Sequence, residues 1–455
     1  MGYRLGVDLG TTFTAAAVGN GRAPTMLGLG NRALQIPSVL FLRDDGAFLV
    51  GEAAERKGLV DPARVVREFK RRMGDPVPLL VGGTPFSPQA LTARLLTWVV
   101  ATATERMGSA PDEVVLTYPA NWGAYKRELL DQVIAMADVG AARTCPEPQA
   151  AAVQYAARSP LDPGERVAVY DLGGGTFDVC VLEKTADGFT ILGTPDGVEH
   201  LGGVDFDEAV FQHVVDALGS VISELDLSTA EAQAALTRLR RDCVEAKEAL
   251  SADVDAVIPV AVPGRNTQVR LTRAELEGLI GPSLQDTVAA TSRALRAANT
   301  TSGQLSAIVL VGGSSRIPPV SHLLQDTFAT TTSLDTHPKH DIALGAVQYA
   351  ATGGPGGAAT PPSPAPSASP PAAPPPALLC CSPSRPLRPI VSRSLPHRPP
   401  DPLHILTPRR PRLRRSPLPC RRAGFLPCGV RARPRGRGGR GGGAAGWRQE
   451  RRRPP

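Results

Sequence analysis

Short apolar runs alternate with longer amphipathic stretches over the first 352 residues. The short runs end at Gly, Pro or Asp, which predicts buried strands that lead into turns; they are residues 5–7, 114–116, 167–169 and 308–311. Helical spacing of apolar residues marks 124–139 and 229–250, and Thr272 with Glu275 forms a capping box that predicts another helix start. Such alternation of strands and helices predicts an α/β fold.

A unit of strand, glycine turn and strand occurs twice, about one domain length apart. Residues 8–14 read Asp-Leu-Gly-Thr-Thr-Phe-Thr, and residues 171–178 read Asp-Leu-Gly-Gly-Gly-Thr-Phe-Asp. Two similar lobes that each present one such turn would form a cleft between them. We therefore expect one lobe at 1–165 and a second at 166–352, with a closing helix near 341–352.

The composition of the two turns indicates phosphate binding. Tight Gly and Thr turns expose several backbone N–H groups in one direction, and glycine lets the backbone approach a ligand closely. Residues 10–12 and 173–176 both qualify. Asp8 and Asp171 precede the turns and Asp178 follows the second. Carboxylates beside a phosphate site imply a cation between them, and Mg²⁺ that keeps its waters is the natural choice.

A third turn at residues 312–316 follows a strand, precedes a helix, and suits the sugar and base of a nucleotide. One such turn is a weak signal, whereas three in order with acids at matching offsets are specific. The chain has no Gly-x-x-x-x-Gly-Lys-[Ser/Thr], which excludes a P-loop protein. No Gly-x-Gly-x-x-Gly follows the first strand, which disfavours a dinucleotide fold.

The formal net charge of +7 conceals two regions of opposite charge. Residues 353–455 contain 20 Arg, no Lys and only Asp401 and Glu450 as acids, so they carry +18. Residues 1–352 therefore carry −11 and form the expected globular body. The overall charge is thus no evidence for nucleic-acid binding by the body.

The basic region is predicted to be disordered. Residues 353–376 read as a Pro/Ala/Gly-rich linker, and 377–455 as an Arg/Pro-rich tail with little apolar surface to bury. Three interpretations stay open: a cationic tail that binds RNA through the Arg-Gly repeats of 433–441, attraction to a membrane surface, or translation out of frame. The absence of Lys, Asn, Tyr and Met favours the third. Nucleic acid is a predicted partner only if the tail is genuine.

Targeting features are absent from the first 352 residues. They contain no run of 18 apolar residues and no signal-peptide pattern, so we expect no membrane segment. The three cysteines of this part, Cys145, Cys180 and Cys243, are widely spaced. Such spacing fits a reducing compartment, and we expect a cytoplasmic protein.

A family resemblance follows from seven motifs. They are residues 6–12, 69–74, 117–120, 147–152, 171–178, 200–207 and 311–318. In this order they resemble the nucleotide-binding domain of the Hsp70 (DnaK-like) chaperones, within the actin/hexokinase-like ATPase superfamily. The resemblance spans residues 3–352. It implies an actin-like fold of two duplicated ribonuclease-H-like lobes with a nucleotide cleft, which binds ATP or ADP with Mg²⁺ and hydrolyses ATP slowly.

The resemblance also implies residue roles. The metal would be anchored through water by Asp8 and Asp171, and Lys70 would orient the attacking water. The rest of the catalytic network would be Glu147, Asp171, Thr176 and Asp178. The nucleotide would be bound by Gly10, Thr11, Thr12, Gly173, Gly174, Gly175, Gly202, Gly203, Lys247, Ser251, Gly312, Gly313, Ser314 and Arg316, the last stacking on adenine. Pro119 and Arg127 match the family's switch pair.

Three positions depart from the family pattern. Val244 and Val204 stand where Glu is usual, and Lys339 stands where Asp is common. The phosphate end therefore resembles the family fully, while the nucleoside pocket has lost carboxylates, and we expect weaker nucleotide binding or looser base selectivity. The segment after residue 351 does not resemble the family's acidic linker, peptide-binding β-sandwich or helical lid. The resemblance thus implies the ATPase domain, with an exchange factor or J-domain protein as a possible partner class.

Two other functions stay open. A small-molecule kinase of the same superfamily would need a hydroxyl-bearing substrate and an Asp placed as a base. The lysine motif at residues 69–74 disfavours it. A non-catalytic nucleotide sensor with a basic, nucleic-acid-binding tail is the other alternative.

Overall fold

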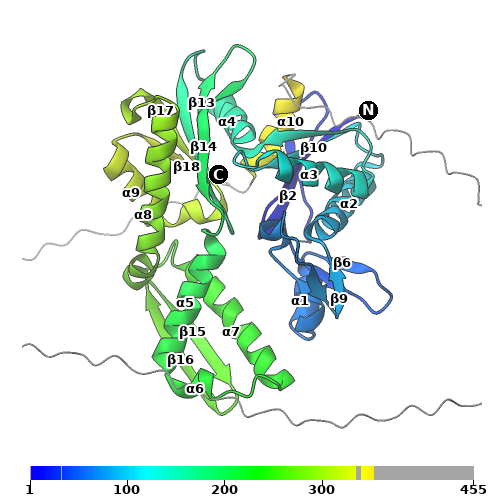
Figure 1. Ribbon diagram of the computed structural model, residues 1–455, viewed down its shortest axis with the longest axis vertical. Helices are drawn as coiled ribbons and strands as arrows, with labels where there is room; N and C mark the ends of the chain where they lie inside the picture. Colours follow the sequence, from blue (N-terminus) through cyan, green and yellow to red (C-terminus); the bar gives the residue numbers. More distant parts are fainter. Residues whose placement is uncertain (1, 32, 335–339, 353–455) are drawn as a thin grey trace, which may run out of the picture. The chain divides into compact units, whose positions relative to one another are not determined.

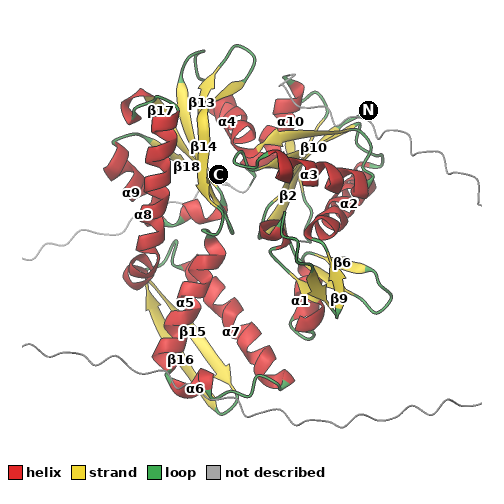
Figure 2. Cartoon of the chain, viewed as in Figure 1, coloured by secondary structure: helices red, strands yellow, loops and turns green. Residues whose placement is uncertain are grey.

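The computed structural model describes residues 2–31, 33–334 and 340–352. These residues belong to one compact unit, which falls within Met1–Pro370. The predicted linker and tail at 353–455 lie outside the described residues, as does Lys339. Figures 1 and 2 show that helices flank the larger sheets of the unit.

The first large sheet has the strand order β11-β10-β1-β2-β3, and β4 also pairs with β2. β1 is antiparallel to β2 and parallel to β10. The strands are β1 (Arg4–Leu9), β2 (Phe13–Gly19), β3 (Thr25–Leu27), β4 (Ile36–Pro37), β10 (Glu113–Tyr118) and β11 (Ala142–Pro146).

The second large sheet repeats this plan with the order β14-β13-β12-β17-β18. β12 is antiparallel to β13 and parallel to β17, as β1 is to β2 and β10. The strands are β12 (Arg166–Leu172), β13 (Phe177–Lys184), β14 (Phe189–Val198), β17 (Leu305–Val311) and β18 (Thr332–Leu334). The repeated topology confirms the predicted α/β fold with two similar lobes.

The predicted apolar runs form the central strands of both sheets. Leu5, Val7, Val167 and Ala168 are fully buried, because helices cover both faces of these central strands. The runs at 114–116 and 308–311 lie in β10 and β17. The hydrophobic pattern therefore identified the centre of each sheet correctly.

Two helices cross between the halves. α4 (Glu147–Arg158) follows the first sheet in sequence and packs against β10 and β11 of that sheet and against β12, β13, β14 and β17 of the second. α10 (Asp341–Ala351) follows the second sheet but packs against β1, β2 and β10, beside the blue strands in Figure 1. α4 and α10 also contact each other. The closing helix assigned to 166–352 thus makes its sheet contacts with the first lobe, and the boundary at 165 stays a prediction.

The predicted helix starts agree with the structure. Thr229 caps α7 (Ala230–Ala249), and Thr272 with Glu275 forms the capping box of α8 (Arg273–Ala297). The helix expected at 124–139 is α3 (Ala124–Ala137), which ends two residues early because Asp138 takes a left-handed conformation with φ 49°. The remaining flanking helices are α2 (Pro88–Met107) and α9 (Pro318–Phe328).

Smaller elements extend each half. In the first they are β5 (Leu40–Leu42), β6 (Phe48–Val50), α1 (Glu52–Gly58), η1 (Pro62–Arg64), β7 (Val65–Val66), η2 (Phe69–Arg72), β8 (Leu79–Val81) and β9 (Thr84–Phe86). In the second they are α5 (Gly203–Leu218), α6 (Ser220–Ser223), β15 (Asp255–Val262), β16 (Arg265–Thr272), η3 (Ser302–Gln304) and η4 (Gly313–Arg316). Across the described ranges, no helix combines the length and apolar character that crossing a bilayer requires.

Candidate active site

The two predicted phosphate turns connect equivalent strands of the two sheets. The first joins β1 to β2, and its Gly10 carbonyl accepts a hydrogen bond from Ser38 Oγ at 2.8 Å. The second joins β12 to β13, where the Gly173 N–H donates to the Thr176 carbonyl at 3.0 Å. The duplicated fold therefore presents two glycine turns at matching positions of its sheets.

The second turn packs against the start of α5. The Val204 N–H donates to the Gly174 carbonyl at 2.7 Å. A Cβ at Gly202 would lie 2.6 Å from the Gly175 nitrogen, which is too close for any side chain because the nitrogen belongs to the backbone and cannot move aside. Glycine at 202 thus allows the N-terminus of α5 to pack directly against the backbone of the second turn.

The third turn meets the second. Gly312 has φ 80°, a left-handed conformation that favours glycine, and a Cβ there would also lie 2.5 Å from Asp171 Oδ1. Ser314 Oγ donates to the Gly173 carbonyl at 2.9 Å. The three turns predicted from separate sequence motifs therefore converge.

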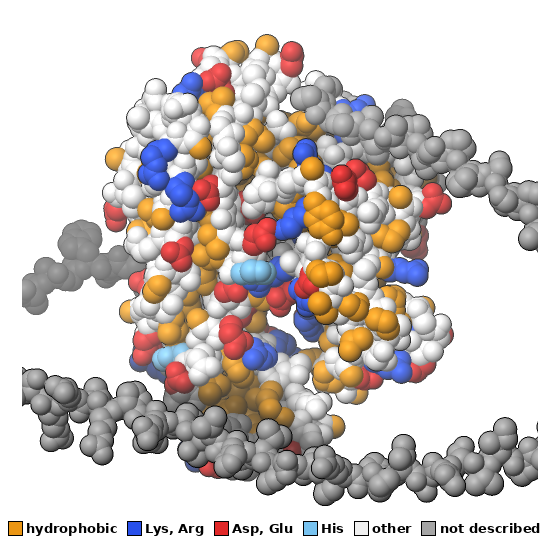
Figure 3. All heavy atoms as spheres, viewed as in Figure 1, with side chains coloured by type: hydrophobic (Ala, Val, Ile, Leu, Met, Phe, Trp, Pro, Cys, Tyr) orange, Lys and Arg blue, Asp and Glu red, His pale blue; other side chains and the backbone are white. Residues whose placement is uncertain are grey.

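A cavity of about 330 Å³ lies where the turns converge, a size typical of ligand pockets. Figure 3 shows charged side chains of both signs gathered around a hollow near the middle of this face. The predicted residues that line the cavity are Asp8, Gly10, Thr11, Thr12, Lys70, Glu147, Asp171, Gly173, Gly174, Thr176, Gly203, Lys247, Ser251, Gly312, Gly313 and Ser314. Residues from both lobes thus form one site.

A lysine and a carboxylate from distant segments form a buried pair at the phosphate end. Lys70 Nζ, on η2, donates to Glu147 Oε1, on the first residue of α4, at 2.8 Å. Their side chains are 14% and 8% exposed. Lys70 Nζ also lies 5.9 Å from the centroid of the Trp122 ring. Lys70 is therefore fixed in position instead of belonging to a solvated basic face.

Acidic side chains surround this pair, and their pKa values are shifted upward. Burial, with the nearby Glu147 charge, raises the pKa of Asp8 and of Asp178 to about 7. The same causes raise the pKa of Asp171 well above its ordinary value. Burial lowers the pKa of Lys70, but the carboxylates of Glu147 and Asp8 outweigh it and raise that pKa overall. Lys70 therefore stays charged, while the acids lack a sufficient countercharge.

The donor set fits a hydrated magnesium ion. Asp178 Oδ1 is buried and has no hydrogen-bond partner among the described residues, and a cation would favour the charged carboxylates. No three His, Cys, Asp or Glu side chains of the described ranges are grouped closely enough to bind a metal directly. Mg²⁺ usually keeps several waters and uses one or two carboxylates with substrate phosphates. Asp8 and Asp171 fit that role, because both line the cavity.

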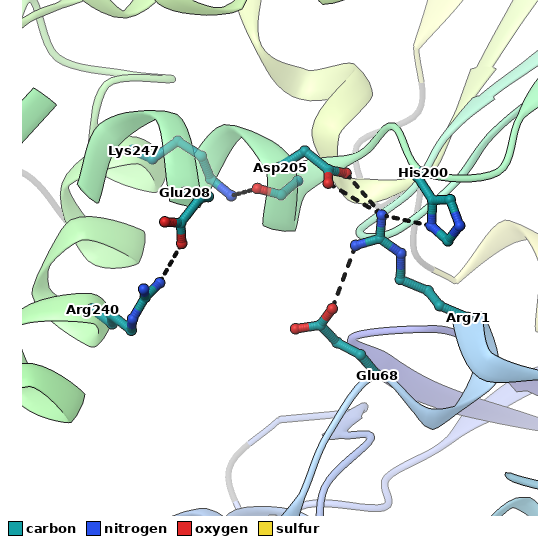
Figure 4. Close-up of polar contacts among 8 residues, drawn as sticks. Glu68, Arg71, His200, Asp205, Glu208, Arg240 and Lys247 are labelled. Atoms are coloured by element: carbon teal, nitrogen blue, oxygen red, sulfur yellow. Dashed lines mark hydrogen bonds and ion pairs between the residues drawn. The ribbon is translucent and has the colours of Figure 1, made fainter. Parts of the chain in front are cut away.

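Lys247 lies at the end of the cavity that is predicted to bind the nucleoside, called the nucleoside end below. Its Nζ lies 2.6 Å from Asp207 Oδ1 and donates to the Gly203 carbonyl at 3.1 Å, so the ammonium group points toward α5 (Figure 4). Ser251 lines the same end. Arg316 is exposed and does not line the cavity. Its stacking on adenine stays a prediction.

Two of the three positions that depart from the family pattern, Val244 and Val204, lie among the described residues. Val244 lines the cavity and places an apolar side chain there. Val204 instead faces an adjacent cavity of about 560 Å³. Carboxylates that the sequence analysis did not select also line the main cavity: Glu55, Asp207, Glu245 and Glu248. The nucleoside end has therefore kept carboxylates, at other positions.

Five further predicted residues do not line the main cavity. Asp178 and Pro119 line a small cavity of about 20 Å³ beside Lys70. Gly175 and Gly202 form the backbone contact behind the second turn. Arg127 is exposed and hydrogen-bonds the Tyr118 side chain. Their predicted roles in binding and switching stay predictions.

Sequence reasoning missed the partners of Arg71. Its guanidinium donates to Asp205 Oδ1 at 3.1 Å and to Oδ2 at 3.3 Å, and lies 3.3 Å from His200 Nδ1 (Figure 4). Arg71 stands next to Lys70 in a basic run, and Asp205 is part of a motif noted for its glycines. Adjacent cations look alike in sequence, so only the fold separates their roles.

Comparison with protein families agrees with this geometry. The family model described as "Hsp70 protein" matches residues 4–356, more than three quarters of the chain. The matched range includes the three turns, Lys70 and Glu147. Hsp70 proteins bind ATP and ADP, generally with Mg²⁺, and as a family they are ATPases of the chaperone type. The chain belongs to the Hsp70 family.

Proposed function

We propose that this chain binds Mg-ATP in the 330 Å³ cavity and hydrolyses it slowly, and that nucleotide state sets the closure of its two lobes. The observation that carries the proposal is the buried Lys70–Glu147 pair beside Thr176, at the end of the cavity where the two phosphate turns meet. Family membership supports the same reaction class.

The residues of the phosphate end would act by positioning and electrostatics, as in phosphoryl transfer generally. Thr11, Thr12 and the N–H groups of the second turn would hold the phosphate oxygens. Lys70 would neutralise charge on the γ-phosphate and orient a water molecule for in-line attack. The water oxygen forms a bond to the γ-phosphorus as the bond to the ADP oxygen breaks, and inorganic phosphate results.

The metal would be held by Asp8 and Asp171 through its waters. When bound, Mg²⁺ neutralises phosphate charge and also supplies the countercharge that these carboxylates lack. Glu147 would keep the Lys70 ammonium aimed at the phosphate, since it accepts a hydrogen bond from Nζ at 2.8 Å.

The two lobes would close around the nucleotide because each lobe supplies some of the contacts to it. The first turn and Lys70 come from the first half, whereas the second and third turns come from the second half. A nucleotide that contacts all of them stabilises the closed arrangement, and loss of the γ-phosphate removes contacts to both turns. We further propose a cytoplasmic location and an exchange factor or J-domain protein as partner, on family membership alone.

Binding and hydrolysis can be separated in one experiment on the full chain. Mg-ATP is expected to raise the melting temperature, because a ligand that binds only the native state stabilises it. Lys70→Ala should keep that rise while phosphate release falls by about 100-fold or more. Lys57→Ala, which removes an exposed lysine outside this cavity, is the matched control and should change neither.

If neither ATP nor ADP moves the melting curve, the site assignment is wrong. If the Lys70→Ala protein releases phosphate at the wild-type rate, the catalytic role is wrong while binding stands. ADP formation that requires an added hydroxyl compound would identify a kinase instead.

A further inference from the structure

The turn at residues 199–202, between β14 and α5, is held from the opposite lobe by two basic side chains. Lys126 of α3 pairs with Glu199. Arg71 of η2 pairs with Asp205, near the start of α5, and contacts His200 (Figure 4). We call Arg71, Lys126, Glu199 and Asp205 the clasp. It joins the two halves of the molecule beside the phosphate end.

The two pairs of the clasp differ in burial. The Arg71 side chain is only 11% exposed, and one of its nitrogens donates to both Asp205 oxygens. Glu199 is 61% exposed, so solvent screens its pair with Lys126. We therefore expect the Arg71 pair to resist opening more than the Lys126 pair does.

A small cavity of about 20 Å³ is lined both by catalytic residues and by residues of the clasp. Lys70, Thr176 and Asp178 line it on the catalytic side, and Lys126 and Glu199 line it at the clasp. Its volume suffices for a single water molecule. None of the predicted nucleoside residues lines it. A route through this cavity, called the path below, is thus separate from the predicted nucleoside residues, and the cavity is too small for phosphate while the clasp is closed.

The charges along this path suit an anion that leaves the site. Lys70, Arg71 and Lys126 line the cavity together with the acids Asp178 and Glu199, so the basic side chains outnumber the acidic ones by three to two. Glu199 and Asp205 neutralise two of these cations while the clasp is closed. A passing phosphate can replace the carboxylates as the partner of Arg71 and Lys126, because arginine and lysine both bind phosphate oxygens.

We propose that this path is the exit site for inorganic phosphate, and that opening of the clasp limits phosphate release after hydrolysis while ADP stays bound. The proposal rests on the proposed ATPase function. The phosphate that leaves is the inorganic phosphate formed when the γ-phosphoryl group is transferred to water, so the exit step needs no further reactant.

The test follows three rates on the full chain in single turnover with Mg-ATP. Hydrolysis is measured by acid quench, phosphate release with a fluorescent phosphate sensor, and ADP release with a fluorescent ADP displaced by excess ATP. Asp205→Asn should release phosphate about fivefold faster, because the ion pair with the Arg71 guanidinium becomes a weaker hydrogen bond to a neutral amide. Hydrolysis and ADP release should stay within about twofold of wild type.

A charge exchange tests the second pair. Glu199→Lys should speed phosphate release by about threefold, and adding Lys126→Glu should restore the wild-type rate by re-forming the pair in reverse. Glu183→Lys is the matched control, because it makes the same Glu-to-Lys change in another ion pair, Arg166–Glu183, which joins β12 and β13. Neither residue lines either cavity, so this variant should change none of the three rates.

Three results would overturn the proposal. Equal acceleration of phosphate and ADP release would mean that the clasp only holds the lobes together. Unchanged phosphate release in both variants would place the exit elsewhere. If the chain hydrolyses no ATP, the proposed ATPase function is wrong, and the exit site needs a separate test. In that test the protein is loaded with Mg-ADP and inorganic phosphate, and the rate of phosphate release is measured. Failure of Asp205→Asn to speed that release would also refute the exit site.

Discussion

The two ends of the cavity hold their charges in different ways. At the phosphate end, Lys70, Glu147 and Asp178 are buried or nearly so, and each lies among other charges. At the nucleoside end, the Lys247–Asp207 pair is buried, but Arg241, Glu245 and Glu248 are exposed. Burial strengthens electrostatic interactions and makes each unpaired charge costly.

This difference indicates which end constrains the sequence more. A change of one charge at the phosphate end alters a network of buried groups, whereas the nucleoside end can exchange carboxylates for valine and compensate with others nearby. Val244 lines the cavity there beside Glu245 and Glu248. Substitutions should therefore have large effects at the phosphate end and small ones at the nucleoside end.

The largest effect is expected for the pH dependence of stability without nucleotide or metal. The pKa of Asp178 is raised to about 7 in the folded protein by burial and by Glu147. A raised folded-state pKa stabilises the protein at acid pH, and this stability is lost as pH rises through 7. From pH 5 to pH 8 the free energy of unfolding should fall by about 3 kcal/mol through Asp178 alone. Urea unfolding of the wild type and of Asp178→Asn measures this, and the variant should lack that part of the slope.

The matched control is Asp196→Asn. Arg293 hydrogen-bonds the Asp196 carboxylate and holds its pKa below the ordinary value, so its contribution is lost only at more acid pH. This variant should lose the same stability at pH 5 and pH 8. If Asp178→Asn keeps the full wild-type slope, the phosphate end is better compensated than its contacts indicate, and the contrast between the ends weakens.

The next effect is smaller and concerns ribose recognition. Val244→Glu places a carboxylate at the cavity wall, where a nucleoside hydroxyl could donate a hydrogen bond. One such bond contributes about 1 kcal/mol, so ADP should bind about fivefold more tightly. Calorimetric titration with ADP and with pyrophosphate separates the ends, because pyrophosphate has no ribose and its affinity should not change.

Val244→Leu controls for side-chain volume and should leave both affinities within about twofold. A change of equal size for ADP and pyrophosphate in Val244→Glu would mean that residue 244 acts through lobe closure. The nucleoside end would then not be independent of the phosphate end.

The fold and most of the site could be predicted from the sequence because both depend on local patterns. Apolar runs that end at Gly, Pro or Asp identified β1, β10, β12 and β17, and the repeated glycine turn identified the duplication. Glycine is required where backbone meets backbone, as at Gly202, or where φ is positive, as at Gly312. These requirements can be recognised in the sequence as glycines at fixed positions of the motifs.

Contacts between distant segments could not be predicted in the same way. The pairing of Arg71 with Asp205 joins residues 134 positions apart, and its neighbour Lys70 pairs with Glu147 instead. The crossing of α10 to the first sheet was likewise invisible, since the helix has buried residues whichever sheet it covers. Arg316, which the sequence reasoning selected for adenine, does not line the cavity, and its stacking on the base stays a prediction.

The smallest expected effect tests Arg316 directly. An exposed arginine over an aromatic ring contributes about 0.5 kcal/mol, so Arg316→Ala should weaken ADP binding only about twofold and leave pyrophosphate binding unchanged. Arg316→Lys keeps the charge but loses the planar group and should have a similar effect. A loss of tenfold or more in ADP affinity would mean that Arg316 is buried against the base when nucleotide binds. The nucleoside end would then close as tightly as the phosphate end, and the contrast between them would hold only for the protein without ligand.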